Sequence, residues 1–384
     1  MDTPFIYNIP VTGKHFTGRK NDVTILGNLL RACENICIYE PPKTGKASLI
    51  NQTLLNLKIS GERFNVISVS LLNVRTELEL AQKTGDAIIR GFATTPDEYK
   101  TLVEQMLPGT HFIFDRIAFS NEDRILSLNW DLDDNDIRSV LSLPFRLAAS
   151  TGVKVFLILN EFQNIMLTED GEKLCHMLEG IFTEFVNADC SYLMCGSQVN
   201  AMKDIFEHRR FFYRQVEHVS LSEIDSKETA EHAVKGFLIS GKVIDRNIML
   251  GVSKLFRNHQ GYINHLMAIS DSLSKGYITE ATLIEALNTL IAIHEPRFIS
   301  TMNDLTTYQV HLLKAITDGN DKFSASEIIQ KYGLSSSANV RRLKDALCKK
   351  EIVTFNSRDE STILDPLFEY WVNKFYFEKK GPNM

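Results

Sequence analysis

The chain has 384 residues, of which 44% are hydrophobic and 23% charged, and its formal net charge is −6. This balance excludes a disordered or fibrous chain, and the length is enough for two or three domains. The sequence has no stretch of roughly 18 apolar residues that would span a bilayer, and no basic segment with an apolar run opens it. We therefore expect a cytoplasmic protein without a membrane partner, in which any contact with nucleic acid comes from a local basic face.

Short apolar runs alternate with longer segments of helical periodicity up to about residue 220. This alternation is typical of βαβ units around a parallel sheet, and runs that are apolar on both sides suit strands buried beneath helices. The predicted strands span residues 36–39, 64–69, 155–159, 191–195 and 218–221. We therefore predict an α/β domain over residues 1–221.

An acidic stretch at residues 131–136 lies in the long insertion between the second and third predicted strands. Its carboxylates could bind a cation, but the spacing lacks the Gly and the terminal Glu of a calcium loop. Acidic residues at the start of a helix accept from its free N–H groups and interact favourably with its dipole. We predict that they cap a helix beginning near Ile137.

The first predicted strand is followed by the sequence EPPKTGKAS at residues 40–48 and then by a helical segment. A strand, a Gly-Lys loop and a helix make a phosphate cradle, because backbone N–H groups and the helix N-terminus face the anion. The Gly-Lys pair can also be an ordinary turn. The candidate nucleotide-binding residues are Pro42, Lys43, Thr44, Gly45, Lys46, Ala47 and Ser48.

Within this loop, Lys46 would reach the β- and γ-phosphates. Glu40 stands where the phosphate-loop pattern has its first Gly, and Ala47 stands where the pattern has the hydroxyl that binds Mg²⁺. The loop is therefore predicted to bind the phosphates of ATP or ADP without a direct protein ligand for the metal.

The third predicted strand ends in Asn160 and Glu161, at the place where a P-loop ATPase carries an acidic pair. Glu161 is the candidate catalytic group that would polarise an attacking water. Asn160 replaces the Asp that holds the metal, and it brings no charge to Mg²⁺. The same pair could simply cap a helix. No metal ligand is assigned, and Mg²⁺ is expected to be weakly held.

The second half of the chain divides into two further predicted domains. Apolar residues at helical spacing predict a helical subdomain over residues 222–300. A winged helix is predicted over residues 301–384, because three helices at 308–317, 325–332 and 339–349 precede a strand pair near 352–355 and 362–364.

Basic residues gather on the last of these three helices, at Arg341, Arg342 and Lys344. A basic recognition helix with polar residues at its start suits entry into the major groove and contact with phosphates. The alternative is a winged helix that contacts protein, with the basic residues forming a solvated face. Double-stranded DNA and a partner protein therefore both remain candidate partners.

Four short motifs follow one another along the chain: FTGR at residues 16–19, CGS at 195–197, FFYR at 211–214 and DPLFEYW at 365–371. Together with the Gly-Lys loop and the Asn-Glu pair, they resemble motifs of the archaeal-type ATPase family, in the STAND and AAA+ branches of P-loop ATPases. The resemblance implies a P-loop parallel-sheet ATPase domain followed by a helical lid and a winged helix.

The resemblance also implies roles for single residues. Arg19 joins the nucleotide-binding residues, Glu161 is the catalytic glutamate and Ser197 a polar sensor. Arg214 is a candidate arginine finger for a neighbouring subunit of a homo-oligomer, although arginines on a polar turn more often pair with carboxylates. Gly261 resembles the glycine of the lid motif, without the proline that follows it in the family.

The sequence thus predicts a nucleotide-dependent switch with weak or absent ATP hydrolysis, coupled to a winged helix that binds DNA or protein. The alternative is a non-catalytic pseudo-ATPase that serves as a DNA- or protein-interaction module. The two differ in whether ATP or ADP binds saturably at the loop.

Overall fold

The structure, a computed structural model, describes residues 4–377. The chain forms two compact units, each built from separate segments. One unit contains the chain up to residue 19, residues 41–52 and the chain from residue 222 onward. The other contains residues 20–40 and 53–221. Among the described helices, none combines the length and apolar character that a membrane crossing requires.

The second unit is built on a five-stranded parallel sheet in the order β2-β5-β6-β1-β7. All five predicted strands are confirmed, although the last one ends three residues earlier than predicted. The interior strands are buried on both faces, as their two-sided apolar character indicates. The strands are β1 Ile36–Tyr39, β2 Phe64–Ser70, β5 Lys154–Asn160, β6 Cys190–Gly196 and β7 Glu217–His218.

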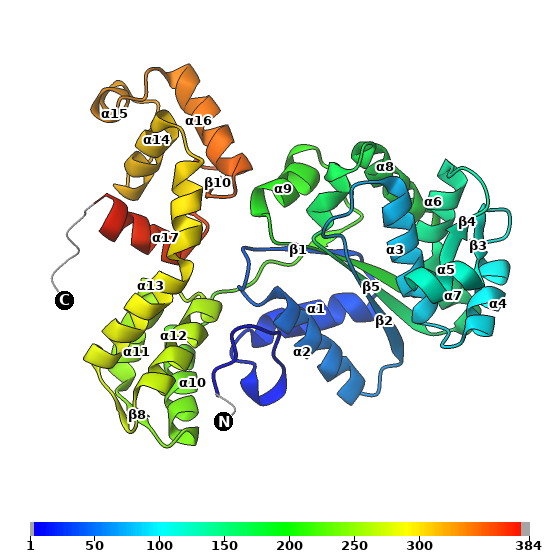
Figure 1. Cartoon of the computed structure of the whole chain (residues 1–384), viewed down its shortest axis with the longest axis horizontal. Helices are drawn as coiled ribbons and strands as arrows, with labels where there is room; N and C mark the ends of the chain where they lie inside the picture. Colours follow the sequence, from blue (N-terminus) through cyan, green and yellow to red (C-terminus); the bar gives the residue numbers. More distant parts are fainter. Residues whose placement is uncertain (1–3, 378–384) are drawn as a thin grey trace. The chain divides into compact units, whose positions relative to one another are not determined.

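Helices cover both faces of this sheet. The chain passes from β1 to the edge strand β2 in one direction and returns through β5 and β6 in the other, so right-handed crossovers place the helices on opposite faces. Figure 1 shows α1 and the later part of α2 on one side of the strands, with α3, α7 and α8 on the other. These helices are α1 Lys20–Arg31, α2 Lys46–Ile59, α3 Glu77–Arg90, α7 Leu143–Thr151, α8 Gly171–Glu184 and the short α9 Val199–Lys203.

The insertion between β2 and β5 carries a small hairpin and three more helices. The predicted acidic cap is confirmed, although its helix α6 begins at Asp134, before the predicted start near Ile137. Asp133 is the N-cap and accepts from the Asp136 N–H at 2.9 Å, while Asp136 accepts from the Asp133 N–H at 2.9 Å. Asp136 also accepts from the His111 backbone at 2.7 Å, so this cluster is explained by capping. The elements are α4 Pro96–Met106, β3 Phe112–Phe114, α5 Arg116–Glu122, β4 Leu126–Leu128 and α6 Asp134–Leu141.

The first unit contains the predicted helical subdomain, with a two-residue parallel strand pair that the sequence did not indicate. The helix α13 contains Pro296 and ends at Asn303, so it runs through the domain boundary expected at residue 300. Pro296 has no N–H to donate to the carbonyl of Ala292, four residues earlier. Ala292 is exposed, so water can bond to that carbonyl. The elements are α10 Ser226–Ile239, β8 Val243–Ile244, α11 Arg246–Leu255, α12 Gln260–Leu273, β9 Tyr277–Ile278 and α13 Glu280–Asn303.

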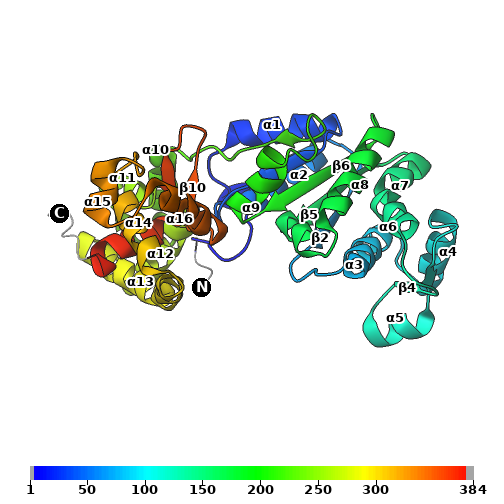
Figure 2. The same cartoon turned by 90° about the horizontal axis from the view of Figure 1, so that it is seen from above.

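The winged helix follows in the same unit, and its predicted helices and strands are confirmed. Ser336 caps the third helix by accepting from the Asn339 N–H at 3.2 Å, and Gly333 ends the preceding helix with a positive φ of 64°. Figure 2 shows the three helices beside the first strand of the hairpin. The elements are α14 Thr307–Thr317, α15 Ser326–Tyr332, α16 Ser337–Lys349, β10 Val353–Phe355, β11 Ser361–Ile363 and α17 Pro366–Trp371.

Candidate nucleotide site and winged-helix surface

The Gly-Lys loop forms a closed turn at the start of α2. Its backbone is constrained, because two prolines open it and Gly45 has a φ of 103°, which other residues avoid. The Pro41 carbonyl accepts from the Thr44 hydroxyl at 2.8 Å and from the Lys46 ammonium at 2.9 Å. The charge of Lys46 therefore lies over the loop, where a phosphate cradle needs a cation.

Arg19, from the FTGR motif, lies against the same loop. Its Nη1 donates to the Thr44 carbonyl at 2.6 Å, and its Nε donates to the Ser222 carbonyl at 2.9 Å. A Cβ at Gly45 would come within 2.8 Å of this guanidinium. The structure thus brings Arg19 together with the loop residues predicted to bind nucleotide.

The first turn of α12 also contacts the loop. The His259 Nε2 lies 3.2 Å from the Pro42 carbonyl, and a Cβ at Gly261 would lie 2.7 Å from the Lys43 carbonyl. Gly261 is the glycine whose sequence context resembles the lid motif. His259 was missed, because a single histidine in a turn carries no motif and histidine is not a preferred helix cap.

Two positions of the loop differ from the phosphate-loop pattern. Ala47 is exposed and offers no oxygen to a metal, whereas the next hydroxyl, that of Ser48, accepts from the Val11 N–H at 3.0 Å. Glu40, which replaces the first glycine, accepts from the Leu221 N–H at 3.3 Å within the second unit. Its carboxylate therefore has a structural partner at the end of β1.

Glu161 and Ser197 meet at the carboxyl edge of the sheet. They follow the neighbouring parallel strands β5 and β6, and the Glu161 carboxylate accepts from the Ser197 hydroxyl at 2.7 Å. The same oxygen accepts from Gln163 at 2.7 Å, a residue that the sequence analysis missed. Glu161 has a φ of 56° and a ψ of 45°, an outlying backbone conformation that in proteins clusters at functional sites.

Asn160 has a structural partner in place of a metal. Its amide donates to the Ser68 hydroxyl at 2.9 Å and lies 3.5 Å from the Val69 carbonyl, so it joins β5 to β2. An aspartate could not donate in this way. The neutral side chain is therefore used by the sheet.

The arginines near residue 210 differ in their surroundings. Arg214 is exposed, with its guanidinium 5.2 Å from the centre of the Tyr213 ring. Arg209 pairs with Asp204 at 2.7 Å and with Glu172. Arg214 therefore stays the candidate finger.

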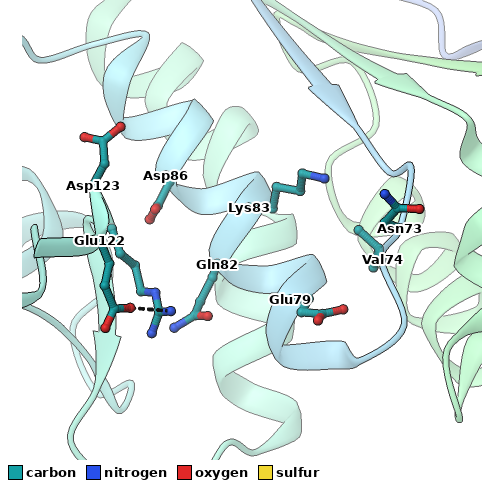
Figure 3. A pocket seen from close by; sticks show the side chains of 9 residues that line it. Asn73, Val74, Glu79, Gln82, Lys83, Asp86, Glu122 and Asp123 are labelled. Carbon is teal, nitrogen blue, oxygen red and sulfur yellow. Dashed lines mark ion pairs between the residues drawn. The ribbon is translucent and has the colours of Figure 1, made fainter.

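A separate hollow of about 330 Å³ lies in the second unit between α3 and the segment before β4 (Figure 3). The Asp86 carboxylate accepts from the N–H groups of Ile125 and Leu126 at 3.1 and 2.8 Å, and burial raises its pKa. Gln82 donates to the Leu126 carbonyl at 3.0 Å. These groups join α3 to β4, so the hollow is explained as a structural joint.

The three basic residues of α16 that were predicted to contact DNA fall into two groups. Arg341 and Arg342 are exposed, whereas the Lys344 side chain is only 15% exposed. The Lys344 ammonium pairs with Asp359 at 2.5 Å and lies 4.8 Å from the centre of the Phe355 ring. Lys344 therefore holds α16 to the wing, whereas of these three residues the two arginines present their charge to a partner.

The fold is a parallel-sheet α/β domain of the P-loop ATPase type with a helical region and a C-terminal winged helix. Residues 296–374 match a family described as a probable winged helix domain. No curated protein matches the chain.

Two solved structures share this architecture over nearly their whole length. A Walker-type ATPase of Pyrococcus abyssi is 15% identical, with a TM-score of 0.67 over 96% of this chain and 99% of that chain. The ORC2 protein of Aeropyrum pernix, solved in ADPNP and ADP complexes, is 13% identical, with a TM-score of 0.60 over 98% of each chain. At these identities the likeness shows the fold, and the predicted order of an α/β domain, a helical region and a winged helix is confirmed.

Proposed function

We propose that the chain binds ATP or ADP at the Gly-Lys loop and acts as a nucleotide-dependent switch with weak or absent hydrolysis. The observation that carries this proposal is the convergence of two cations on one constrained loop, since Lys46 and Arg19 both donate to its carbonyls. An entering phosphate would replace a neutral carbonyl as the partner of Lys46, and charge-assisted hydrogen bonds are the stronger kind. The nucleotide complexes of the similar ORC2 protein support a nucleotide in this fold.

Weak hydrolysis follows from what the site offers to Mg²⁺. In a working P-loop ATPase a hydroxyl and an aspartate hold the metal that offsets charge as the bond breaks. Ala47 supplies no oxygen, and the Asn160 amide is bonded to Ser68. Glu161, oriented by Ser197, remains available to polarise a water. Residual turnover would therefore run through Glu161 with a weakly held metal.

A titration of ATP and ADP tests the switch. Lys46→Ala should weaken binding by about 1.5–3 kcal/mol, or roughly 10- to 150-fold, because it removes a charged hydrogen-bond donor. Lys58→Ala removes the same charge from the exposed end of the same helix and should leave the affinity unchanged. Equal affinity in Lys46→Ala and the parent would remove the nucleotide assignment in favour of a pseudo-ATPase interaction module.

The winged helix is proposed to bind double-stranded DNA through the two exposed arginines of α16. Ser335 and Ser336, whose hydroxyl groups lie at the start of the same helix, line a hollow of about 510 Å³. Replacing Arg341 and Arg342 by Ala should lower duplex affinity. It should also reduce the slope of log affinity against log salt concentration by about 0.9 for each phosphate contact that is lost.

The matched control replaces Lys349 and Lys350, which are exposed at the other end of α16 and carry the same charge. It should change the salt slope less than the arginine variant does. Absence of duplex binding by the parent at low salt would assign the winged helix to contact with a protein.

A further inference from the structure

The segment 257–262, which runs from the turn after α11 into the first turn of α12, contacts the Gly-Lys loop on one side and the winged helix on the other. Its first two residues have positive φ values of 48° and 56°, which non-glycine residues seldom adopt. Arg257 donates to the Ile363 carbonyl at the end of β11 at 2.5 Å. His259 contacts the Pro42 carbonyl at 3.2 Å. All these residues belong to the first unit.

His259 makes two directional bonds with one imidazole. It is 9% exposed, and burial lowers its pKa, so the neutral ring has one donor and one acceptor. Nδ1 accepts from the Tyr262 N–H at 3.3 Å, which caps α12. The proton is therefore on Nε2 and is donated to Pro42. Any displacement of the Pro42 carbonyl thus acts directly on the start of α12.

Tyr262 continues the contact into the winged helix. Its ring lies on the His259 ring, with centroids 4.6 Å apart, and its hydroxyl donates to Asp365 at 2.9 Å. Arg297 donates to the same carboxylate oxygen at 2.7 Å. The other Asp365 oxygen accepts from the N–H groups of Leu367 and Phe368 at 3.0 and 3.1 Å, which caps α17.

We infer that His259 is a positioning residue of the Gly-Lys loop and that, with Tyr262, it couples the loop to Asp365 and hence to the orientation of α17 in the winged helix. This inference rests on the proposed nucleotide binding. Because Pro41 and Pro42 have no N–H, they offer only carbonyls, and the Pro41 carbonyl is the present partner of Lys46. A phosphate that recruits Lys46 changes the bonding of this Pro-Pro pair, and the adjoining carbonyl is the one that His259 holds.

Hydrogen exchange of the α17 cap measures this coupling in the full-length chain. Saturating ADP should slow exchange of the Leu367 and Phe368 amides by about 5- to 150-fold, the usual range of coupling between two sites. His259→Asn keeps a side-chain cap for α12 but is too short to reach Pro42. Tyr262→Phe keeps the ring and removes the hydroxyl that Asp365 accepts from. In both variants ADP should leave the exchange of these two amides unchanged.

The matched control is Tyr332→Phe, which removes another buried hydroxyl of the winged helix, bonded to Asp318 at 2.7 Å. This variant should keep the full response to ADP. A loss of the response in Tyr332→Phe as well would point to general destabilisation of the winged helix. If His259→Asn does not fold, the Tyr262→Phe result decides alone. Retention of the response in Tyr262→Phe would overturn the coupling.

Calorimetric titration of ADP on the same samples separates the two ways of failing. Saturable binding without a change in α17 exchange in the parent would overturn the coupling and leave the proposed function standing. Absence of saturable binding would overturn the proposed function, and the coupling would fall with it. Binding together with slowed exchange that is lost in both variants is the expected result.

Discussion

The Gly-Lys loop of the first unit and the carboxyl edge of the sheet in the second unit differ in what they offer to the proposed function. The loop keeps its cations, with Lys46 and Arg19 both bonded to its backbone. The sheet edge keeps Glu161 and its partner Ser197, but its metal-holding position is an amide bonded to Ser68. In the proposed function, phosphate binding therefore depends on the loop and metal binding on the sheet edge, so the two can be tested separately.

The largest expected effect comes from restoring the metal ligands. The double variant Ala47→Thr and Asn160→Asp should raise Mg²⁺-dependent ATP turnover by about 10- to 100-fold, since each factor of ten corresponds to roughly 1.4 kcal/mol of barrier. Glu161→Gln on that background should remove the gain. Steady-state phosphate release measured over a range of Mg²⁺ concentrations checks both.

The matched control for the hydroxyl is Ala47→Val with Asn160→Asp, which has a similar shape without the oxygen. It should gain less than the threonine version. Brisk Mg²⁺-dependent hydrolysis by the unaltered chain, lost in Lys46→Ala, would show that other groups hold the metal and that the contrast between the two regions is wrong.

The sequence predicted the elements that depend on local patterns and missed the contacts between distant segments. The apolar runs predicted all five strands of the main sheet, because a buried parallel strand is apolar on both faces. Arg341 and Lys344 look alike in the sequence, yet Lys344 is held by Asp359 and Phe355 from the wing. A lone His259 likewise carried no signal, since its partner Pro42 lies 217 residues away.

Two glycines give a smaller effect that tests the loop side alone. A Cβ at Gly261 would lie 2.7 Å from the Lys43 carbonyl, whereas a Cβ at Gly251 in α11 would meet nothing within 4 Å. Gly261→Ala should lower the free energy of unfolding by about 1–3 kcal/mol through overpacking, and it should weaken nucleotide binding. Gly251→Ala should raise the free energy of unfolding by about 0.5–1 kcal/mol. Urea unfolding and an ADP titration measure both; similar values for the two variants would contradict the close contact of α12 with the loop.

The smallest expected effect is a pH dependence of the free energy of unfolding that arises from His265 in α12. Burial, followed by the charges of His294 and Lys43, lowers the pKa of His265 to about 4, and its ring stacks on Tyr7 at 3.9 Å. The unfolded chain takes up a proton at this histidine near pH 6.5, where the folded chain does not. The contribution of His265 to the free energy of unfolding therefore falls as the pH drops from about 6.5 to 4 and levels off below that. His265→Phe keeps an aromatic ring against Tyr7 and removes the titration. Its free energy of unfolding, followed by urea titration between pH 7 and 4.5, should therefore depend less steeply on pH. Because His265 binds a single proton, the slope of the free energy of unfolding against pH can fall by at most about 1.4 kcal/mol per pH unit. An unchanged slope would show that His265 is protonated equally in the folded and unfolded chains, and the acid sensitivity would then have to come from elsewhere in the molecule.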